Sequence, residues 1–171
     1  TYTVEHKIDG FKIVLTYRNG VLVLAATRGD GAVGENVTDN VRTIESIPLR
    51  LERDGGEELV VEGEIWMSKH DFETLNRERA AQDEPLFANP RNVAAGSIRQ
   101  LDPKVAASRK LDNFIYDVSW ASIEIPKTQF EELNFIKELG FKVNKHYKLC
   151  SNIEEVIDFW RLEEKKAGKE D

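Results

Sequence analysis

The sequence has only one cysteine, Cys150, and this scarcity excludes an internal disulfide and any zinc site built from several cysteines. It also lacks a run of about 18 apolar residues, the length that a membrane-spanning helix requires, so we expect no span and no membrane partner. Residues 1–5 lack the basic and then apolar stretches of a signal peptide. They look like a strand entered partway, so we expect a trimmed chain. The cysteine scarcity and these other absences predict a cytoplasmic protein.

Basic side chains are too few for a protein that binds nucleic acid through its overall charge. Lys and Arg number 24 against 31 Asp and Glu, which gives a net charge of -7 at pH 7, whereas such binders are usually basic. Any contact with DNA would therefore have to come from a local patch or from partner domains. The 171 residues, 40% of them apolar, are enough for one domain with its own core.

Alternation and turn residues predict short strands joined by hairpins, together with separate helices. Residues 1–9 alternate, which would place Glu5, Lys7 and Asp9 on one face of a strand. Asn19 and Gly20 predict a two-residue hairpin turn, because both tolerate a positive φ. Further strands are expected at residues 11–18, 21–27, 59–67, 114–120 and 141–149, helices at 37–44, 90–101 and 128–140 and after caps at Ser68 and Ser151, and a glycine-rich loop at 28–34. This pattern predicts an α+β fold with mainly antiparallel sheets and flanking helices.

The spacing of Glu5, Lys7 and Asp9 allows two interpretations. A lysine between two carboxylates can be an ordinary surface charge pattern, because exposed ion pairs contribute little and are common. It can also be a nucleophilic lysine. Free lysine has a pKa of about 10.4, so a nucleophilic lysine would need a nearby cation or desolvation to lose its proton. With two carboxylates beside it, that reading requires Mg²⁺ or a partner domain in the site.

Several motifs favour the nucleophile. Residues 7–10, Lys-Ile-Asp-Gly, resemble the K-x-D-G signature of covalent nucleotidyltransferases, a group that includes DNA ligases, RNA ligases and mRNA capping enzymes. Residues 26–31, 34–44, 47–49 and 87–103 resemble the pattern of bacterial NAD-dependent DNA ligases. The resemblance is dense from Glu5 to about Val118. It implies the DNA ligase/mRNA capping enzyme nucleotidyltransferase-like core, and the stretch 87–103 argues against an ATP-dependent enzyme.

The resemblance implies a role for each matched position. Lys7 matches the lysine that attacks the α-phosphate of NAD and becomes lysine–AMP, and Asp9 matches the signature aspartate that supports the later joining of DNA. Glu5 matches a residue beside the adenine, Arg28 one that contacts the ribose and AMP, and Glu64 one that binds the ribose hydroxyls. These residue types suit the task, because carboxylates accept hydroxyl hydrogen bonds and arginine donates a fork to phosphate oxygens. Each could also be a loop or surface residue.

A basic stretch follows at residues 91–110. Arg91 and Arg99 lie eight apart on one predicted helix, and Lys104, Arg109 and Lys110 extend the positive charge. In the family this stretch faces the nicked duplex, and contact with phosphates would account for the charge. A solvated helix face is the alternative.

The resemblance covers only part of a ligase. We expect residues 1–171 to be a partial adenylation domain without the N-terminal helical segment, the later lysine motifs, the OB-fold, the zinc finger, the helix-hairpin-helix region and the BRCT domain. The implied function is NAD-dependent joining of nicks in duplex DNA during replication and repair, with NAD and Mg²⁺ as cofactors and the missing domains as partners. A truncated or non-catalytic nucleotide- or DNA-binding module of the same fold is the alternative. We assign no metal ligand, and we expect His6, an unusual residue at its position, to be neutral and buried.

Overall fold

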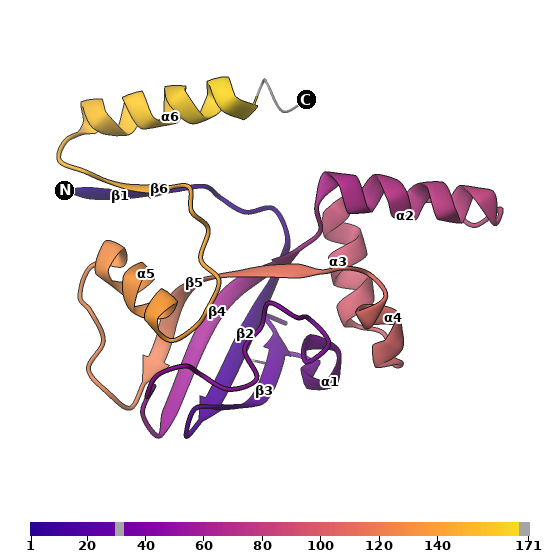
Figure 1. Cartoon of the computed structure of the whole chain (residues 1–171), viewed down its shortest axis with the longest axis horizontal. Helices are drawn as coiled ribbons and strands as arrows, with labels where there is room; N and C mark the ends of the chain where they lie inside the picture. Colours follow the sequence, from indigo (N-terminus) through magenta and orange to yellow (C-terminus); the bar gives the residue numbers. More distant parts are fainter. Residues whose placement is uncertain (30–32, 168–171) are drawn as a thin grey trace.

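A four-stranded antiparallel sheet forms the centre of the computed structural model, which describes residues 1–29 and 33–167. Its order is β3 (Val21–Thr27), β2 (Phe11–Arg18), β4 (Glu58–Trp66) and β5 (Asp112–Ala121). Every neighbouring pair runs antiparallel. The helices flank this sheet (Figure 1), so the predicted α+β class with antiparallel sheets is confirmed.

The predicted hairpin joins β2 to β3. Asn19 and Gly20 have φ values of 47° and 73°, and Arg18 pairs with Val21 directly across the turn. Two central residues with positive φ match the right-handed twist of paired strands, which is why this dipeptide closes hairpins. The turn thereby fixes the register of β2 against β3.

Strand β4 separates a buried face of the sheet from an open one. Leu59, Val61 and Ile65 point to the core and are fully buried, whereas Glu62 and Glu64 lie on the other face. This strict alternation is the period of a half-buried strand. The buried face packs against apolar residues of the helices and loops, including Val41, Val93, Ile98, Ile136, Leu139 and Phe141. The open face is left for polar side chains.

Side-chain caps start the longer helices, and those at Ser68 and Thr128 were predicted. Ser68 accepts a hydrogen bond from the Asp71 amide at 3.0 Å and begins α2 (Lys69–Ala81). Asn89 and Thr128 do the same for α3 (Pro90–Ile98) and α5 (Gln129–Glu138). Such caps satisfy amides that have no partner within the helix. The short helices α1 (Thr38–Val41) and α4 (Pro103–Ala107) complete the group beside β2 and β3.

A second, smaller layer lies across one end of the central sheet (Figure 1). Strands β1 (Tyr2–Glu5) and β6 (Tyr147–Cys150) form a two-stranded antiparallel sheet, and α6 (Ile153–Ala167) packs on it. The loop from β1 to β2 connects this layer to the main sheet. No helix in the described ranges is long and apolar enough to cross a membrane.

Several predicted boundaries were wrong. Residues 6–9 are a loop, so the expected common strand face of Glu5, Lys7 and Asp9 does not exist. The strand expected at 141–149 is regular only from Tyr147, and the helix from Pro90 ends at Ile98 rather than near 101. The cap of α6 is Asn152, whose Oδ1 accepts from the Glu155 amide at 3.0 Å, rather than Ser151. Residues 30–32 of the glycine-rich loop and the end of the chain, 168–171, lie outside the described residues.

Candidate active site

The loop that carries Lys7 is held against β4 by a close backbone approach. Gly10 is buried, and a Cβ at this position would lie 2.3 Å from the Ile65 carbonyl oxygen and 2.7 Å from Glu64 Cγ. No residue with a side chain can make that approach without displacing the backbone. The glycine of the Lys-Ile-Asp-Gly signature therefore sets Lys7 next to Glu64.

Lys7 lies where two cavities meet on the open face of the sheet. One, of about 350 Å³, is lined by Lys7, Glu5, Glu64 and Tyr116. The other, of about 570 Å³, also takes in Lys7, Glu64 and Tyr116 and extends to the basic residues Arg28, Arg91 and Arg99. The nucleophile expected from the sequence is exposed at the wall that both cavities share.

Glu64 sits on β4 between these cavities. The Tyr116 hydroxyl lies 3.4 Å from Glu64 Oε2, a long hydrogen bond. Burial raises the pKa of Glu64 above its ordinary value, while the positive charges of Lys7 and Arg91 oppose that rise. Lys7 and Arg91 line the larger cavity together with Glu64. Glu64 can accept hydrogen bonds from the hydroxyls of a sugar placed in either cavity.

Three arginines contribute positive charge to the larger cavity. Arg91 Nη1 lies 3.3 Å from Asp9 Oδ1, and the Asp9 side chain is 82% exposed, so this pair can rearrange around a ligand. Arg99 Nε lies 2.9 Å from Glu35 Oε2, and its guanidinium stacks on the Phe11 ring at 5.0 Å. Arg28 is exposed at the end of β3. A cavity with several guanidinium groups favours an anion such as phosphate.

The smaller cavity adjoins a group of carboxylates. Partial burial raises the pKa of Glu5, the neighbouring charges of Glu132 and Asp117 raise it further, and Gln129 opposes them. The pKa of Asp117 is itself raised by burial and by Glu62, its partner across the β4–β5 pair. This end of the site is negative and the arginine end is positive. A bound molecule would therefore place its phosphate near Arg28, Arg91 and Arg99.

The structure brings the predicted site residues together, but it divides the predicted basic stretch. Lys7, Asp9, Arg28, Glu64, Arg91 and Arg99 line one cavity, and Glu5 lines the adjoining one with Lys7. Arg109 instead packs against the Phe87 ring at 5.9 Å, with its Nε buried, and Lys110 lies 3.8 Å from Asp71. Arg109 and Lys110 therefore contact residues outside the cavity and do not line it.

Sequence reasoning missed several lining residues, and it placed His6 incorrectly. Tyr116 and Phe11 line the cavity, as does Lys12, which forms an ion pair with Glu62. Tyr116 could have been predicted. It lies two residues after Phe114 in the expected strand 114–120, and residues two apart in a strand face the same side of the sheet. His6 is exposed rather than buried, and it contacts Glu163 of α6.

Comparison with known proteins gives one consistent result. The family model for the NAD-dependent DNA ligase adenylation domain matches residues 1–169. A DNA ligase from Caldicellulosiruptor saccharolyticus is 53% identical over 98% of this chain, one from Thermotoga petrophila is 56% identical over 94%, and one from Bacillus licheniformis is 52% identical over 99%. The chain spans about a quarter of the length of these relatives, 23 to 25%. An α+β fold, a lysine loop against β4 and a match over almost the whole chain show that it belongs to the NAD-dependent DNA ligase adenylation domain family.

Proposed function

We propose that this chain is the central part of an adenylation domain in which Lys7 takes up AMP from NAD during the joining of nicked duplex DNA. The Lys7 Nζ lone pair attacks the α-phosphorus of NAD, the bond to nicotinamide mononucleotide breaks, and the amine loses a proton. The AMP then passes to a DNA 5′-phosphate before the nick is closed. Phosphoryl transfer of this kind depends mainly on positioning and on neutralising charge.

One observation carries the proposal: the nucleophile, a carboxylate for the ribose and a group of arginines line the same cavity. Lys7, Glu64 and Arg28 come from three different segments, and the cavity that they share has a volume of about 570 Å³. In the proposed arrangement Glu64 accepts from the ribose hydroxyls, Arg28 donates to the AMP phosphate, and Glu5 lies beside the adenine in the smaller cavity. Each role matches the charge of the part of the cavity in which the residue lies.

Mg²⁺ is proposed as the cation that enters with the nucleotide. This ion is usually held by one or two carboxylates together with substrate phosphates, rather than by a cage of protein ligands. Among the described residues, Asp9 has a largely exposed carboxylate at the rim of the cavity, so the site fits that mode. Bound there, the ion would neutralise phosphate charge. Asp9 would hold the ion. Its ion pair with Arg91 would then break, which would leave Arg91 free to contact the substrate.

Arg91 and Arg99 are proposed to contact the backbone of the nicked duplex. Both are exposed at one end of the 570 Å³ cavity, at the two ends of α3. Their current partners, Asp9 and Glu35, are themselves exposed, so exchanging these partners for DNA phosphates costs little. Because the chain has a net charge of -7, its own contact with DNA has to come from a local basic patch such as this one.

Intact mass spectrometry tests the adenylation step. The chain, and a version that carries any flanking sequence its gene encodes, are each incubated with Mg²⁺ and either NAD or ATP. We expect an increase in mass of one AMP unit from NAD in the extended version. The Lys7→Arg variant should lose it, because a guanidinium is not nucleophilic, whereas Lys127→Arg, at an exposed lysine outside both cavities, should keep it.

Two results would contradict the proposal in different ways. An adduct formed from ATP alone would overturn the assignment of NAD as the AMP donor. The absence of any adduct in the extended version would favour the alternative, a non-catalytic nucleotide- or DNA-binding module of the same fold.

A further inference from the structure

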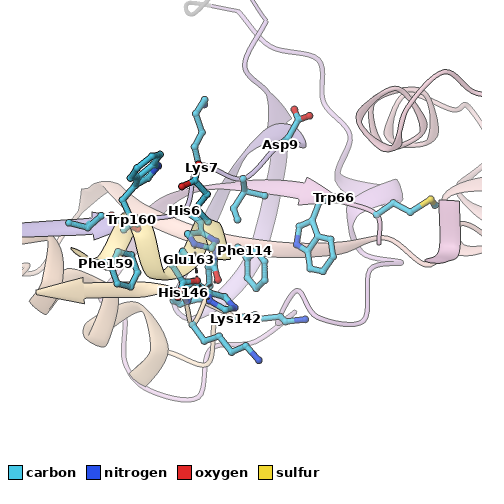
Figure 2. A pocket seen from close by; sticks show the side chains of 18 residues that line it. His6, Lys7, Asp9, Trp66, Phe114, Lys142, His146, Phe159, Trp160 and Glu163 are labelled. Carbon is cyan, nitrogen blue, oxygen red and sulfur yellow. Dashed lines mark hydrogen bonds and ion pairs between the residues drawn. The ribbon is translucent and has the colours of Figure 1, made fainter. Parts of the chain in front are cut away.

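Three ligand-type side chains converge on the side of the Lys7 loop away from the arginines. They are His6 from the loop after β1, His146 from the segment before β6, and Glu163 from α6. Glu163 Oε2 lies 3.1 Å from His6 Nε2 and 2.8 Å from His146 Nδ1. Figure 2 shows the three side chains turned toward one another, with the Lys7 side chain pointing away from them. The cluster and the Lys7 side chain thus lie on different sides of the loop backbone, although Lys7 and Asp9 also line the cavity that the cluster lines.

The cluster has the donor set of a transition-metal site. Its two imidazole nitrogens and one carboxylate oxygen all lie within 4.8 Å of one another. Within the described residues, these three form the group of at least three His, Cys, Asp or Glu side chains close enough together to hold one metal ion. Imidazole favours zinc, nickel, copper and related ions, whereas Mg²⁺ and Ca²⁺ prefer oxygen ligands. Three protein ligands with an open fourth position are a common arrangement for Zn²⁺.

Neighbouring groups orient the three side chains. Lys166 Nζ holds the other carboxylate oxygen, Glu163 Oε1, at 2.6 Å, which leaves Oε2 facing the histidines. The two imidazole rings are stacked, with centroids 4.8 Å apart and planes 8° from parallel, so one ring has to turn about its χ2 bond before both nitrogens can point at one ion. The His146 amide donates to Asn144 Oδ1 at 3.0 Å, which constrains its backbone. Partners that fix the direction of metal ligands in this way increase affinity for the ion.

Exposure gives an ion a route to the cluster. The Glu163 side chain is only 9% exposed, whereas those of His6 and His146 are 40% and 37% exposed. All three line a cavity of about 950 Å³. An ion could enter through that cavity, bind the buried carboxylate and keep a water molecule on the open side. The buried carboxylate also needs positive partners, which an ion would supply together with Lys166.

We propose that His6, His146 and Glu163 bind one divalent transition-metal ion of the zinc class. The ion links α6 to the residue that directly precedes Lys7, so it ties the outer layer to the loop of the candidate active site. The role is structural. It does not depend on the adenylation chemistry, and the ion is distinct from the Mg²⁺ proposed to enter with the nucleotide. A metal that binds only the folded chain stabilises it by mass action.

Metal titration of the chelator-treated chain tests the site. We expect calorimetry with Zn²⁺ to give one ion per chain and thermal melting to show a higher Tm with Zn²⁺ than with chelator. Co²⁺ should give the visible absorption of a low-coordinate nitrogen and oxygen site. Excess Mg²⁺ should not compete, because it binds imidazole nitrogen poorly and prefers oxygen ligands.

Matched substitutions locate the ion. His6→Gln, His146→Gln and Glu163→Gln should each weaken Zn²⁺ binding by about tenfold or more, while His70→Gln should leave it unchanged. His70 is the remaining histidine of the chain, and it is exposed on α2. His6 and His146 are partly exposed, so their variants should fold, and circular dichroism of the metal-free proteins checks this.

Three outcomes would overturn the proposal. The first is the absence of Zn²⁺ binding by the folded wild-type chain. The second is unchanged affinity in the folded His6→Gln and His146→Gln variants. The third is a thiolate-to-cobalt charge-transfer band, which would assign the ion to the buried Cys150 instead.

Discussion

Gly10 links the lysine loop to strand β4 through contacts that a side chain cannot make. A Cβ there would overlap the Ile65 carbonyl oxygen and Glu64 Cγ. Gly63 plays a similar part between β4 and β5, since its Cβ would lie 2.4 Å from the Phe114 carbonyl oxygen. Gly10 ends the Lys-Ile-Asp-Gly signature, and Gly63 directly precedes Glu64. Gly10 and Gly63 thus fix the backbone positions of Lys7 and Glu64.

Gly10→Ala should therefore destabilise the chain by about 1–3 kcal/mol, the usual cost of overpacking. It should also lower adenylation in the extended protein, because Lys7 moves with the loop. Urea denaturation measures the first effect and intact mass the second.

Gly96→Ala is the matched control. Gly96 lies inside α3, and a Cβ there meets nothing within 4 Å. It should stabilise the chain by roughly 0.5–1 kcal/mol, because alanine favours a helix over glycine. Equal effects of the two substitutions would show that the Gly10 approach does not matter.

Strands β4 and β5 place two acidic residues opposite each other. Glu62 and Asp117 are cross-strand partners, and like charges in that position are unfavourable. Burial and Glu62 raise the pKa of Asp117, while Lys12 lowers it. The folded state is therefore favoured while Asp117 is protonated, and this contribution is lost as the pH rises through its raised pKa. At neutral pH the repulsion between Glu62 and Asp117 therefore lowers the stability of this strand pair, which the sequence pattern alone did not show.

Asp117→Asn should raise the free energy of unfolding at pH 7, by less than about 1 kcal/mol because the site is partly solvated. The gain should shrink as the pH falls toward the ordinary pKa of Asp, about 3.9. Thermal melts from acid to neutral pH measure it. Glu124→Gln, at an exposed residue of the loop after β5, should show no such trend. A gain that grows toward acid pH would contradict the assignment.

Element boundaries followed the sequence where the signals were local. Ser68 and Thr128 cap their helices as expected, because a cap involves only the next three residues, whereas Asn152 replaces the expected Ser151 as the cap of α6. The strand predicted through Lys7 was wrong, because alternation alone cannot tell a strand from an extended loop. That loop lacks a strand partner after His6, whose amide donates to the His146 carbonyl.

The chain as a whole is acidic, whereas Arg28, Arg91 and Arg99 lie together at one cavity. A net charge of -7 repels DNA at long range, so the proposed DNA contact rests on the arginines of that cavity. The proposed DNA contact should then be weak and strongly dependent on salt.

Fluorescence anisotropy with a nicked duplex should show affinity falling as the salt concentration rises. Arg99→Ala should reduce the slope of log affinity against log salt by about 1, the expected value for one lost phosphate contact. Arg53→Ala is the control, because Arg53 pairs with Glu138 on an exposed surface outside the cavity. An unchanged slope in Arg99→Ala would remove this residue from the proposed interface.

The sequence by itself determined the fold class, the hairpin, the caps at Ser68 and Thr128 and the family, because these depend on neighbouring residues and on motifs. It also singled out Lys7, Arg28 and Glu64, although it could not show that they share a cavity. Only the tertiary structure decided that sharing, because the three residues lie on separate segments brought together by sheet pairing and by the Gly10 contact. The same is true of His6, His146 and Glu163, which are far apart in the sequence. They meet because β1 pairs with β6 and α6 packs on both strands.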